Sequence, residues 1–365
     1  MKRDVLSNQR HSTSYTGSPS AVGVRLRGMK RESMQQVQPS GPQTGMVALT
    51  GATGFVGRHI VDRLIEGGYR VRALVRSPEK AKRLLPNEAI GDGRVTLFEG
   101  ALGDPDALRH LVAGCDACIH LVGIIRETKG QTFQHVHVDG TRNIVEACRQ
   151  QQPGMRYVHM SALGVGPDKR AGYRDTKHQA ERIVKGAGLA WTIVRPGLIH
   201  GPDGEFTQMA VDWVRGKAPP YFFIPYFSRW KPDGFGFEAP SVAPVFVDDV
   251  SRVFVEALGN TTSQHRTYEL SGSEALRFPD MLKTYARSLD PKPKDRPAIG
   301  LPWAVAAWQA RIAKLLGLGG LLPFDEGMAI MGGRDSISTN AGVIADFGFT
   351  PAEFETSLKS YAHRL

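Results

Sequence analysis

The sequence predicts an α/β fold in which a doubly wound parallel sheet is followed by a smaller C-terminal lobe. Short runs rich in β-branched residues alternate with helical patterns from residue 46 to about 260. The first such run leads directly into TGATGFVG, a turn with glycines spaced three apart. Beyond residue 196 the alternation gives way to a stretch rich in Pro, Gly and aromatic residues. Strands that alternate with helices make right-handed crossovers, and these produce a parallel sheet with both faces covered.

The elements can be read in order along the chain. Each strand is a short apolar run and each helix has apolar residues at helical spacing. We expect strands at 46–50, 69–75, 94–98, 116–122, 156–161 and 190–196. We expect helices at 55–66, 78–85, 104–113, 133–151, 173–187 and 249–258. This is a Rossmann-type domain over 46–260 with a small-lobe insertion at about 200–243, and residues 262–365 form a C-terminal small lobe that serves the substrate.

Charge and composition narrow the class of protein. The net charge is +10 over 365 residues, and residues 1–45 contribute seven basic against two acidic residues, 7 − 2 = +5. The rest of the excess is spread without a basic stripe, so we expect no nucleic-acid partner. Residues 1–45 are expected to be a disordered basic leader, read either as a plain tail or over-long start or as an organellar transit peptide. No apolar run is long enough to span a membrane.

The cysteines and histidines suggest neither redox nor metal chemistry. Cys115 and Cys118 form an isolated C-x-x-C that reads as a buried strand, and the sparse, odd set of three cysteines fits a reducing cytoplasm. His135 and His137 are two residues apart in a helix and face different sides. We therefore expect no metal site.

The glycine turn lies between the first strand and the first helix, where a dinucleotide pyrophosphate binds. Gly51 permits the tight turn, Gly54 allows close approach of the pyrophosphate, and Gly57 lets the helix pack on the strand. The free N–H groups and the dipole of the helix N-terminus favour an anion there. The cofactor-binding residues expected in this turn are Gly51, Thr53, Gly54, Phe55, Val56, Gly57 and Arg58.

The end of the second strand indicates which dinucleotide binds. An acidic residue there would accept the ribose 2′-hydroxyl of NAD, but the chain has Val75 followed by Arg76. Arg76, with Arg58 as a second cation, could pair with a 2′-phosphate. The sequence thus favours NADP(H), with NAD(H) as the alternative.

A candidate proton-transfer set follows the fifth strand. In YRDTK, Tyr173 and Lys177 are one helical turn apart, and Ser161 stands at the end of the strand before them. An ammonium group near a phenol favours the phenolate, and a Ser hydroxyl can polarise a carbonyl. Ser161, Tyr173 and Lys177 are therefore the candidate catalytic residues.

These motifs together resemble the short-chain dehydrogenase/reductase superfamily, in its extended or atypical, epimerase/dehydratase-like form. TGATGFVG, YRDTK, RPGLIHGP and PVFVDDV occur in that superfamily's order and spacing. The resemblance implies Ser161, Tyr173 and Lys177 as the triad, with Lys177 also holding the nicotinamide ribose. It further implies that Gly123 and the backbone of Arg195, Pro196 and Gly197 line the cofactor.

A narrower similarity is carried by HLVGIIRE, FQHVHVDGTRNIVEAC and HMSALG. These phrases resemble the alpha-subcomplex subunit 9 group, the accessory NADPH-binding subunit of respiratory complex I, which works beside ubiquinone reduction. That similarity implies a cofactor-holding accessory or assembly protein with a respiratory-complex or membrane-surface partner. It implies a cytoplasmic place, peripheral at the inner membrane, or on the matrix side in a mitochondrion. The alternative is an active NADP-dependent oxidoreductase or epimerase/dehydratase acting on a carbonyl or alcohol.

The chain departs from the extended pattern at two places. Gly100 is followed by Ala101 where extended members carry Asp near the adenine. His137 occupies the place of the Asn that takes part in the usual proton relay. A retained Tyr and Lys pair therefore does not by itself establish turnover.

Three further features have two readings each. Asp248 and Asp249 resemble a carboxylate pair, but the helical stripe after them makes Asp248 a natural N-cap. The aromatic stretch 221–237 is either a lid over an apolar substrate or, as we favour, small-lobe core. The segment 303–316 either lies on a membrane or partner surface or, as we favour, is a buried helix.

Overall fold

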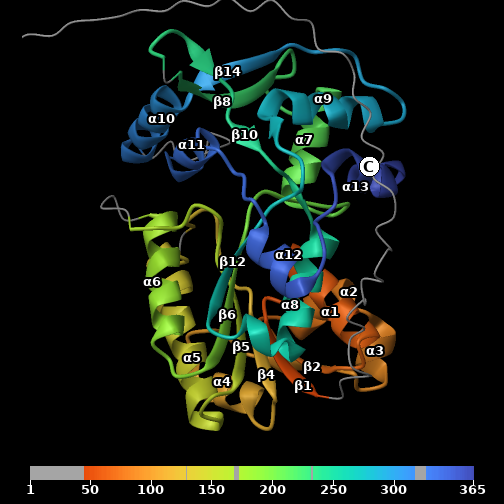
Figure 1. Cartoon of the computed structure of the whole chain (residues 1–365), viewed down its shortest axis with the longest axis vertical. Coiled ribbons are helices and arrows are strands. Elements are labelled where there is room, and N and C mark those ends of the chain that lie inside the picture. Colours follow the sequence, from red (N-terminus) through yellow and green to blue (C-terminus); the bar gives the residue numbers. More distant parts are fainter. Residues whose placement is uncertain (1–44, 129, 168–171, 232, 317–325) are drawn as a thin grey trace, which may run out of the picture. The chain divides into compact units, whose positions relative to one another are not determined.

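The computed structural model describes residues 45–128, 130–167, 172–231, 233–316 and 326–365, all within one compact unit, Pro39–Leu365. The expected leader at residues 1–45 therefore lies outside the described residues except for Gly45. Figure 1 shows the arrangement of the helices and strands. None of the helices within these ranges is long and apolar enough to cross a membrane.

The central sheet has seven strands, all paired in parallel, in the order β12-β6-β5-β4-β1-β2-β3. Its order reverses between β1 and β4, the kind of switch point where open α/β sheets bind ligands. The strands are β1 (Met46–Thr50), β2 (Arg70–Val75), β3 (Val95–Glu99), β4 (Ala117–His120), β5 (Arg156–Met160), β6 (Ala190–Pro196) and β12 (Arg266–Leu270). β1 and β4 are almost wholly buried, as expected for strands covered on both faces. The predicted fold class is confirmed.

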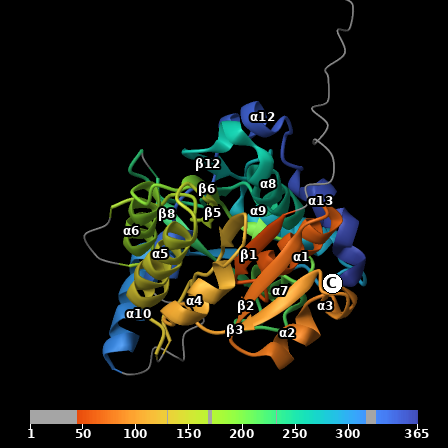
Figure 2. The same cartoon turned by 90° about the horizontal axis from the view of Figure 1, so that it is seen from below.

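Helices cover both faces of this sheet, as Figure 2 shows. One core joins the sheet to α1, α8 and α12, and the other joins it to α4, α5 and α6. The helices of this domain are α1 (Phe55–Glu66), α2 (Pro78–Leu84), α3 (Asn87–Gly91), α4 (Pro105–Val112), the π-helical turn η1 (Gln134–Asp139), α5 (Gly140–Gln151), α6 (Tyr173–Lys185), α8 (Val247–Gly259), the 3-10 turn η2 (Thr261–Ser263) and α12 (Ala341–Phe347).

Local sequence explains where several of these helices begin. Asp104 accepts hydrogen bonds from the N–H groups of Asp106 and Ala107, and Pro105 takes the first helical position of α4. Ser77 caps α2 in the same way by accepting from Lys80 N. These caps place the two helices directly after the carboxyl ends of β3 and β2.

The smaller lobe is assembled from segments on either side of α8. Its helical core packs α7, α9 and α13 together, and a second cluster packs α10 and α11 on β8. Its strands are β7 (Ile199–His200), β8 (Ile224–Trp230), β9 (Phe237–Glu238), β10 (Ser241–Val242), β11 (Val245–Phe246), β13 (Leu276–Arg277) and β14 (Ala298–Pro302). Its helices are α7 (Glu205–Arg215), α9 (Phe278–Ser288), α10 (Trp303–Leu315), α11 (Glu326–Gly332), α13 (Phe354–Tyr361) and the 3-10 turn η4 (Ala362–Arg364).

The structure differs from the sequence reading at four places. Residues 266–270, which were placed in the small lobe, form β12 of the central sheet. α8 begins at Val247, so Asp248 is in its first turn, and the carboxylate binds His59 instead of capping the helix. The aromatic side chains of Phe222 and Phe235 are exposed and do not form core. α10 also exposes large apolar side chains, so the reading of a buried helix is wrong.

Candidate active site

The glycine turn has the backbone geometry that a dinucleotide needs. Gly51 has φ +83°, in the left-handed region that favours glycine, and its carbonyl accepts from Gly54 N at 3.0 Å. A Cβ at Gly57 would lie 2.1 Å from Gly51 O, so only glycine lets α1 approach the turn this closely. Gly54 precedes α1 without a side-chain cap, and the first turn of α1 has no acidic residue. This backbone geometry leaves room for the pyrophosphate that the sequence predicts here, and the binding itself stays a prediction.

The two candidate cations for a 2′-phosphate differ in whether another side chain of the protein already pairs with them. Arg76 is exposed at the end of β2 and has no hydrogen bond or ion pair among the described residues. Arg58 instead pairs with Asp203 at 2.6 Å. His59, next to it, contacts both Asp203 and Asp248 at 3.2 Å. The start of α1 is thus tied to the loop after β7 and to α8, which leaves Arg76 as the unengaged cation.

Lys177 lies buried beneath the loop that follows β4. Its Nζ donates to Met160 O at 2.9 Å, at the end of β5. A Cβ at Gly123 would lie 2.8 Å from the same Nζ, so the absence of a side chain there makes room for the ammonium group. Burial lowers the pKa of Lys177 to about 8. The structure therefore brings Lys177 and Gly123 together, and their roles toward a cofactor stay predictions.

Tyr173 is the first residue of α6 and lies among aromatic rings. Its ring meets those of His137 at 5.4 Å and Phe133 at 5.9 Å, both edge to face. Burial raises the pKa of Tyr173 to about 12. The phenol is therefore protonated at neutral pH in this arrangement.

The hydroxyl of Ser161 is hydrogen-bonded to a buried carboxylate. Its Oγ donates to Glu181 Oε1 at 2.6 Å, and both side chains are buried. Arg195 donates to the two carboxylate oxygens of Glu181 through Nε and Nη2, each at 2.7 Å. Burial raises the pKa of Glu181, but the hydrogen bonds from Arg195 and Ser161 outweigh it and hold that pKa below its usual value. Ser161 thus belongs to a buried, charged hydrogen-bond network between β5, α6 and β6.

His137 also has both ring nitrogens engaged. Its Nε2 accepts from Ile124 N at 3.1 Å, so its proton lies on Nδ1 and is donated to Thr176 Oγ1 at 2.9 Å. Thr176 in turn donates to Gly172 O at 2.9 Å. Burial and the nearby charge of Lys177 lower the pKa of His137 to about 3, so the ring is neutral. The imidazole therefore links the loop after β4 to the start of α6.

The residues at the end of β6 form another side of the candidate site. Gly197 N donates to Leu270 O at 2.8 Å, which fixes the turn after Pro196 to β12. A Cβ at Gly197 would lie 3.1 Å from Ser336 Oγ and 3.5 Å from Leu163 Cδ2. Pro196 and Gly197 thus stand near the end of β5, where Lys177 is bound.

Sequence reasoning missed Glu181, Thr176 and Asp203. Glu181 is four residues after Lys177 and eight after Tyr173, so helical spacing puts it on the same face of α6. That spacing was a usable signal for Glu181. The roles of Thr176 and Asp203 depend on contacts across the fold that no local pattern predicts.

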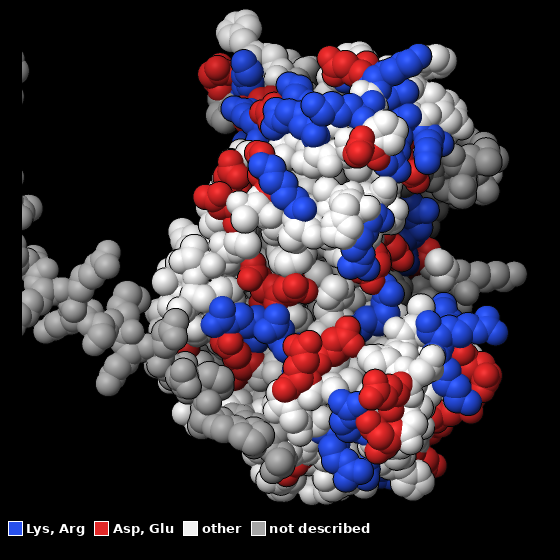
Figure 3. Space-filling view, turned by 90° about the vertical axis from the view of Figure 1, so that its right-hand side faces the viewer, with Lys and Arg blue, Asp and Glu red and all other residues white. Residues whose placement is uncertain are grey.

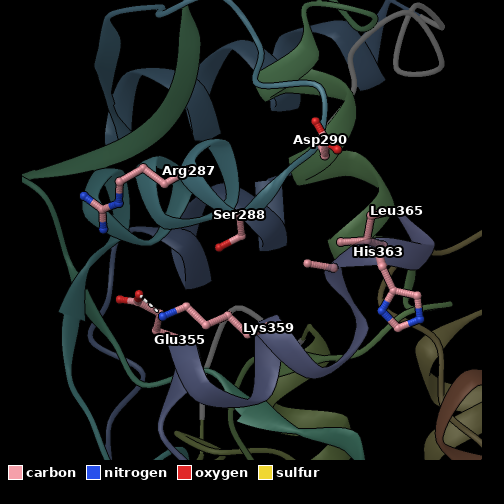
Figure 4. A pocket seen from close by; sticks show the side chains of 8 residues that line it. Arg287, Ser288, Asp290, Glu355, Lys359, His363 and Leu365 are labelled. Atoms are coloured by element: carbon pink, nitrogen blue, oxygen red, sulfur yellow. Dashed lines mark ion pairs between the residues drawn. The ribbon is translucent and has the colours of Figure 1, made fainter.

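One cavity in the described part of the chain lies away from these residues, in the small lobe. It measures about 530 Å³ between the end of α9 and α13 and is shown in Figure 4. Its charged lining includes Lys359, which pairs with Glu355 at 2.7 Å, and Arg287. None of the predicted site residues lines it, so this cavity is separate from the glycine turn.

Comparison with known proteins agrees with this geometry. A family model described as NAD(P)H-binding matches residues 51–214. A ceramide reductase of Caulobacter vibrioides is 37% identical over 175 residues, 48% of this chain and 52% of that protein. The chain therefore spans about half the length of that relative. A (4-alkanoyl-5-oxo-2,5-dihydrofuran-3-yl)methyl phosphate reductase of Streptomyces griseus is 30% identical, over 67% of this chain and 74% of that protein.

A further match, over most of this chain, is to a respiratory-chain subunit. NADH dehydrogenase (ubiquinone) 1 alpha subcomplex subunit 9, mitochondrial, of Mus musculus is 26% identical over 320 residues, 86% of this chain and 78% of that protein. Among solved structures, an NADPH-dependent quinone oxidoreductase of Escherichia coli complexed with NADPH has a TM-score of 0.63 at 17% identity, covering 86% of this chain and 99% of that one. Together with the glycine turn and the Tyr173 and Lys177 pair, these matches establish that the chain belongs to the NAD(P)H-binding short-chain dehydrogenase/reductase superfamily.

Proposed function

We propose that this protein holds NADP(H) as a bound ligand in an accessory or assembly role and does not turn it over. The observation that carries the proposal is the hydrogen bond from Ser161 to Glu181. A serine that polarises a substrate carbonyl must donate its single hydroxyl proton to that carbonyl. Ser161 has committed this proton to a buried carboxylate that also neutralises Arg195. Releasing it would leave part of a buried charge without its partner, which is costly.

The other residues of the site are better placed to bind than to move protons. Lys177 points its ammonium at the loop of Gly123, where it would hold the nicotinamide ribose. The uncapped start of α1 would hold the pyrophosphate. NADP(H), when bound, supplies hydride chemistry at its nicotinamide ring. Both ring nitrogens of His137 are hydrogen-bonded, one to Ile124 and the other to Thr176. Neither is therefore available to bind a water molecule in a proton relay.

The preference for NADP(H) rests on Arg76. Its exposed guanidinium stands where an acidic residue would bind the ribose of NAD. A guanidinium pairs with a phosphate through two parallel hydrogen bonds, and this adds selectivity as well as affinity. Arg58 contributes less because Asp203 already engages it.

A working reductase is the alternative, and a specific observation favours it. A ceramide reductase is 37% identical over 48% of this chain, and Tyr173 and Lys177 retain the spacing that proton transfer requires. In this alternative Tyr173 donates the proton to a carbonyl oxygen while Lys177 lowers the pKa of the phenol. A nucleotide-bound state would then have to shift the pKa of Tyr173 down from about 12.

The long match to a respiratory-chain subunit supports a respiratory-complex or membrane-surface partner. It also supports a place at the inner face of the cytoplasmic membrane, or on the matrix side in a mitochondrion. Identification of proteins that co-purify with the native chain tests this part separately from nucleotide binding.

Extraction of the nucleotide from natively purified protein tests the proposal. We expect about one NADP(H) per chain. Lys177→Met should reduce both the nucleotide content and the rise in melting temperature that added NADPH gives, because a ligand that binds only the folded state stabilises it. Since this change also leaves Met160 O without its donor, each shift is measured against the same variant without nucleotide. Nucleotide-free protein that NADPH does not stabilise would refute the proposal.

A further inference from the structure

Exposed apolar side chains are concentrated in one part of the small lobe. Of the fourteen large apolar side chains that are exposed in the described residues, eleven lie within residues 221–237 and 299–316. Seven of the eleven belong to the three-stranded sheet β14-β8-β9 and to α10, which follows β14 without a break, and the other four flank these elements. Scattered exposed apolar residues are ordinary, but a concentration of this kind marks an interaction surface.

The faces of α10 are inverted relative to an ordinary surface helix. Its inner face consists of the buried alanines Ala306, Ala307 and Ala310. Its outer face carries Val305, Trp308 and Leu315, which are 50%, 63% and 78% exposed. With the half-buried Ile312 between them these residues are spaced three, four and three apart, so they form one stripe along the helix. Large side chains thus face outward where small ones face the protein.

The neighbouring strand extends this apolar stripe. Leu301 of β14 pairs with Phe227 of β8, and Phe227 packs against the alanine face of α10. Ile299 is two residues before Leu301, so both side chains point to the side of the sheet on which α10 lies. Both are exposed. We call the outer face of α10 together with Ile299 and Leu301 the β14–α10 face.

These segments together with the residues that flank them carry a net positive charge. Residues 217–240 and 291–316 contain eight Lys and Arg against three Asp and Glu, 8 − 3 = +5. Residues 46–365 as a whole contain 39 and 34, which is also +5, so the excess is concentrated here and is not spread as the sequence suggested. Lys217, Lys292, Lys294 and Arg311 are exposed. Figure 3 shows Lys and Arg side chains, with some Asp and Glu among them, over the upper part of the molecule on the side opposite α10 in Figure 1.

We propose that the β14–α10 face docks on an anionic phospholipid bilayer, with α10 lying in the plane of the interface. A stripe of aliphatic and tryptophan side chains beside lysine and arginine matches the acyl boundary and the anionic headgroups together. The alanine face is already packed on the protein, so only one side of α10 is available to the lipid. A nucleic acid would use the charge, but an aliphatic stripe gives its bases nothing to stack on. The proposal rests on the membrane-surface partner of the proposed function and deepens it, because it assigns the surface of this chain and its occupant.

Vesicle co-sedimentation of the full-length protein tests this inference. Vesicles of phosphatidylcholine alone are compared with vesicles that also contain phosphatidylglycerol, at low and high salt. We expect binding to the anionic vesicles, weaker binding to the neutral ones, and loss of the difference at high salt. The double variant Trp308→Glu, Leu315→Glu should bind anionic vesicles about tenfold or more weakly.

The double variant Ile337→Glu, Ile344→Glu is the matched control. It adds the same two charges at exposed apolar positions outside the β14–α10 face, and it should bind vesicles like the wild type. Wild type that ignores anionic vesicles, or a Trp308, Leu315 variant that binds as well as the control, would overturn the proposal. If the wild type does not bind vesicles, and the Trp308, Leu315 variant loses binding to an acidic protein, the face is a protein interface. That result would also overturn the proposal. Nucleotide content, measured on the same samples, separates this failure from failure of the proposed function.

Discussion

Replacement of Gly57 by alanine tests whether the glycine turn is built as described. The new Cβ would lie 2.1 Å from Gly51 O and 2.9 Å from two backbone atoms of Ala52. Ordinary contact begins at 3.4 Å, so α1 must move away from the turn by about 3.4 − 2.1 = 1.3 Å. Backbone atoms cannot rotate out of the way, so the cost is at the upper end of overpacking, about 3 kcal/mol. Alanine's better helix propensity returns about 1 kcal/mol, which leaves about 2 kcal/mol of destabilisation.

The assay is chemical unfolding together with NADPH titration, with two other glycines as controls. Gly91 lies in α3 with no atom within 4 Å of a new Cβ, so Gly91→Ala should leave both stability and affinity intact or slightly raise stability. Gly54 is exposed and its Cβ would be 3.3 Å from Gly51 O, so Gly54→Ala should weaken NADPH binding with little loss of stability. Gly57→Ala should lower both the folding stability and the affinity for NADPH. If it unfolds and binds like Gly91→Ala, the account of the turn is wrong.

Three further predictions follow from the charges around the site. Arg76→Glu should weaken NADPH by on the order of 1.5–3 kcal/mol and leave NADH unchanged in parallel titrations; an equal loss for both would count against a 2′-phosphate contact. Glu181→Gln should destabilise the fold by about 3 kcal/mol in urea unfolding, because it leaves Arg195 without its buried partner; a wild-type midpoint would show that the pair does not matter. Burial lowers the pKa of His59, but hydrogen bonds to Asp248 and Asp203 raise it more, so it ends above 6.5. Its ion pairs therefore stabilise the fold below about pH 6.5, and this stabilisation is lost as pH rises through the raised pKa. Unfolding free energies of His59→Gln across that range should lack this component, and an unchanged pH profile would argue against it.

The central sheet was predictable because its strands are buried on both faces. Runs such as MVALT at 46–50 and AWTIVRP at 190–196 are largely apolar and do not alternate with polar residues. They match β1 and β6 residue for residue. β12 was not predicted because it is an edge strand, RTYEL, in which only Tyr268 and Leu270 are buried. It also pairs with β6, from which the small-lobe segments and α8 separate it along the chain, and no local pattern says which sheet such a strand joins.

The hydrophobic periodicity of α10 does not predict which side of the helix is buried. The segment WAVAAWQARIAKL is apolar on both faces, so the pattern fits a buried helix as well as a surface one. Only the packing reveals that its alanines face inward and that Trp308 faces outward. Residue size, with small side chains in one stripe and large ones in the other, was the signal available in the sequence.

The candidate site divides in the same way. The turn at Gly51, Gly54 and Gly57 and the pair Tyr173 and Lys177 follow from spacing within single elements. The partner of Ser161 lies on another element, and hydroxyl groups bond equally well to a carbonyl or a carboxylate, so its pairing with Glu181 needed the fold. His137 was recognised as a departure, but its bonds to Ile124 and Thr176 likewise depend on the fold.

The most direct test of the central claim is turnover by protein that carries its nucleotide. Absorbance of bound NADPH is followed while a broad panel of ketones, quinones and nucleotide sugars is added to wild type and to Tyr173→Phe. The account predicts about one NADPH per chain, no sustained oxidation with any compound, and the same result for both proteins. Steady oxidation by the wild type, reduced by about two to four orders of magnitude in Tyr173→Phe while NADPH still binds, would contradict it and establish an enzyme.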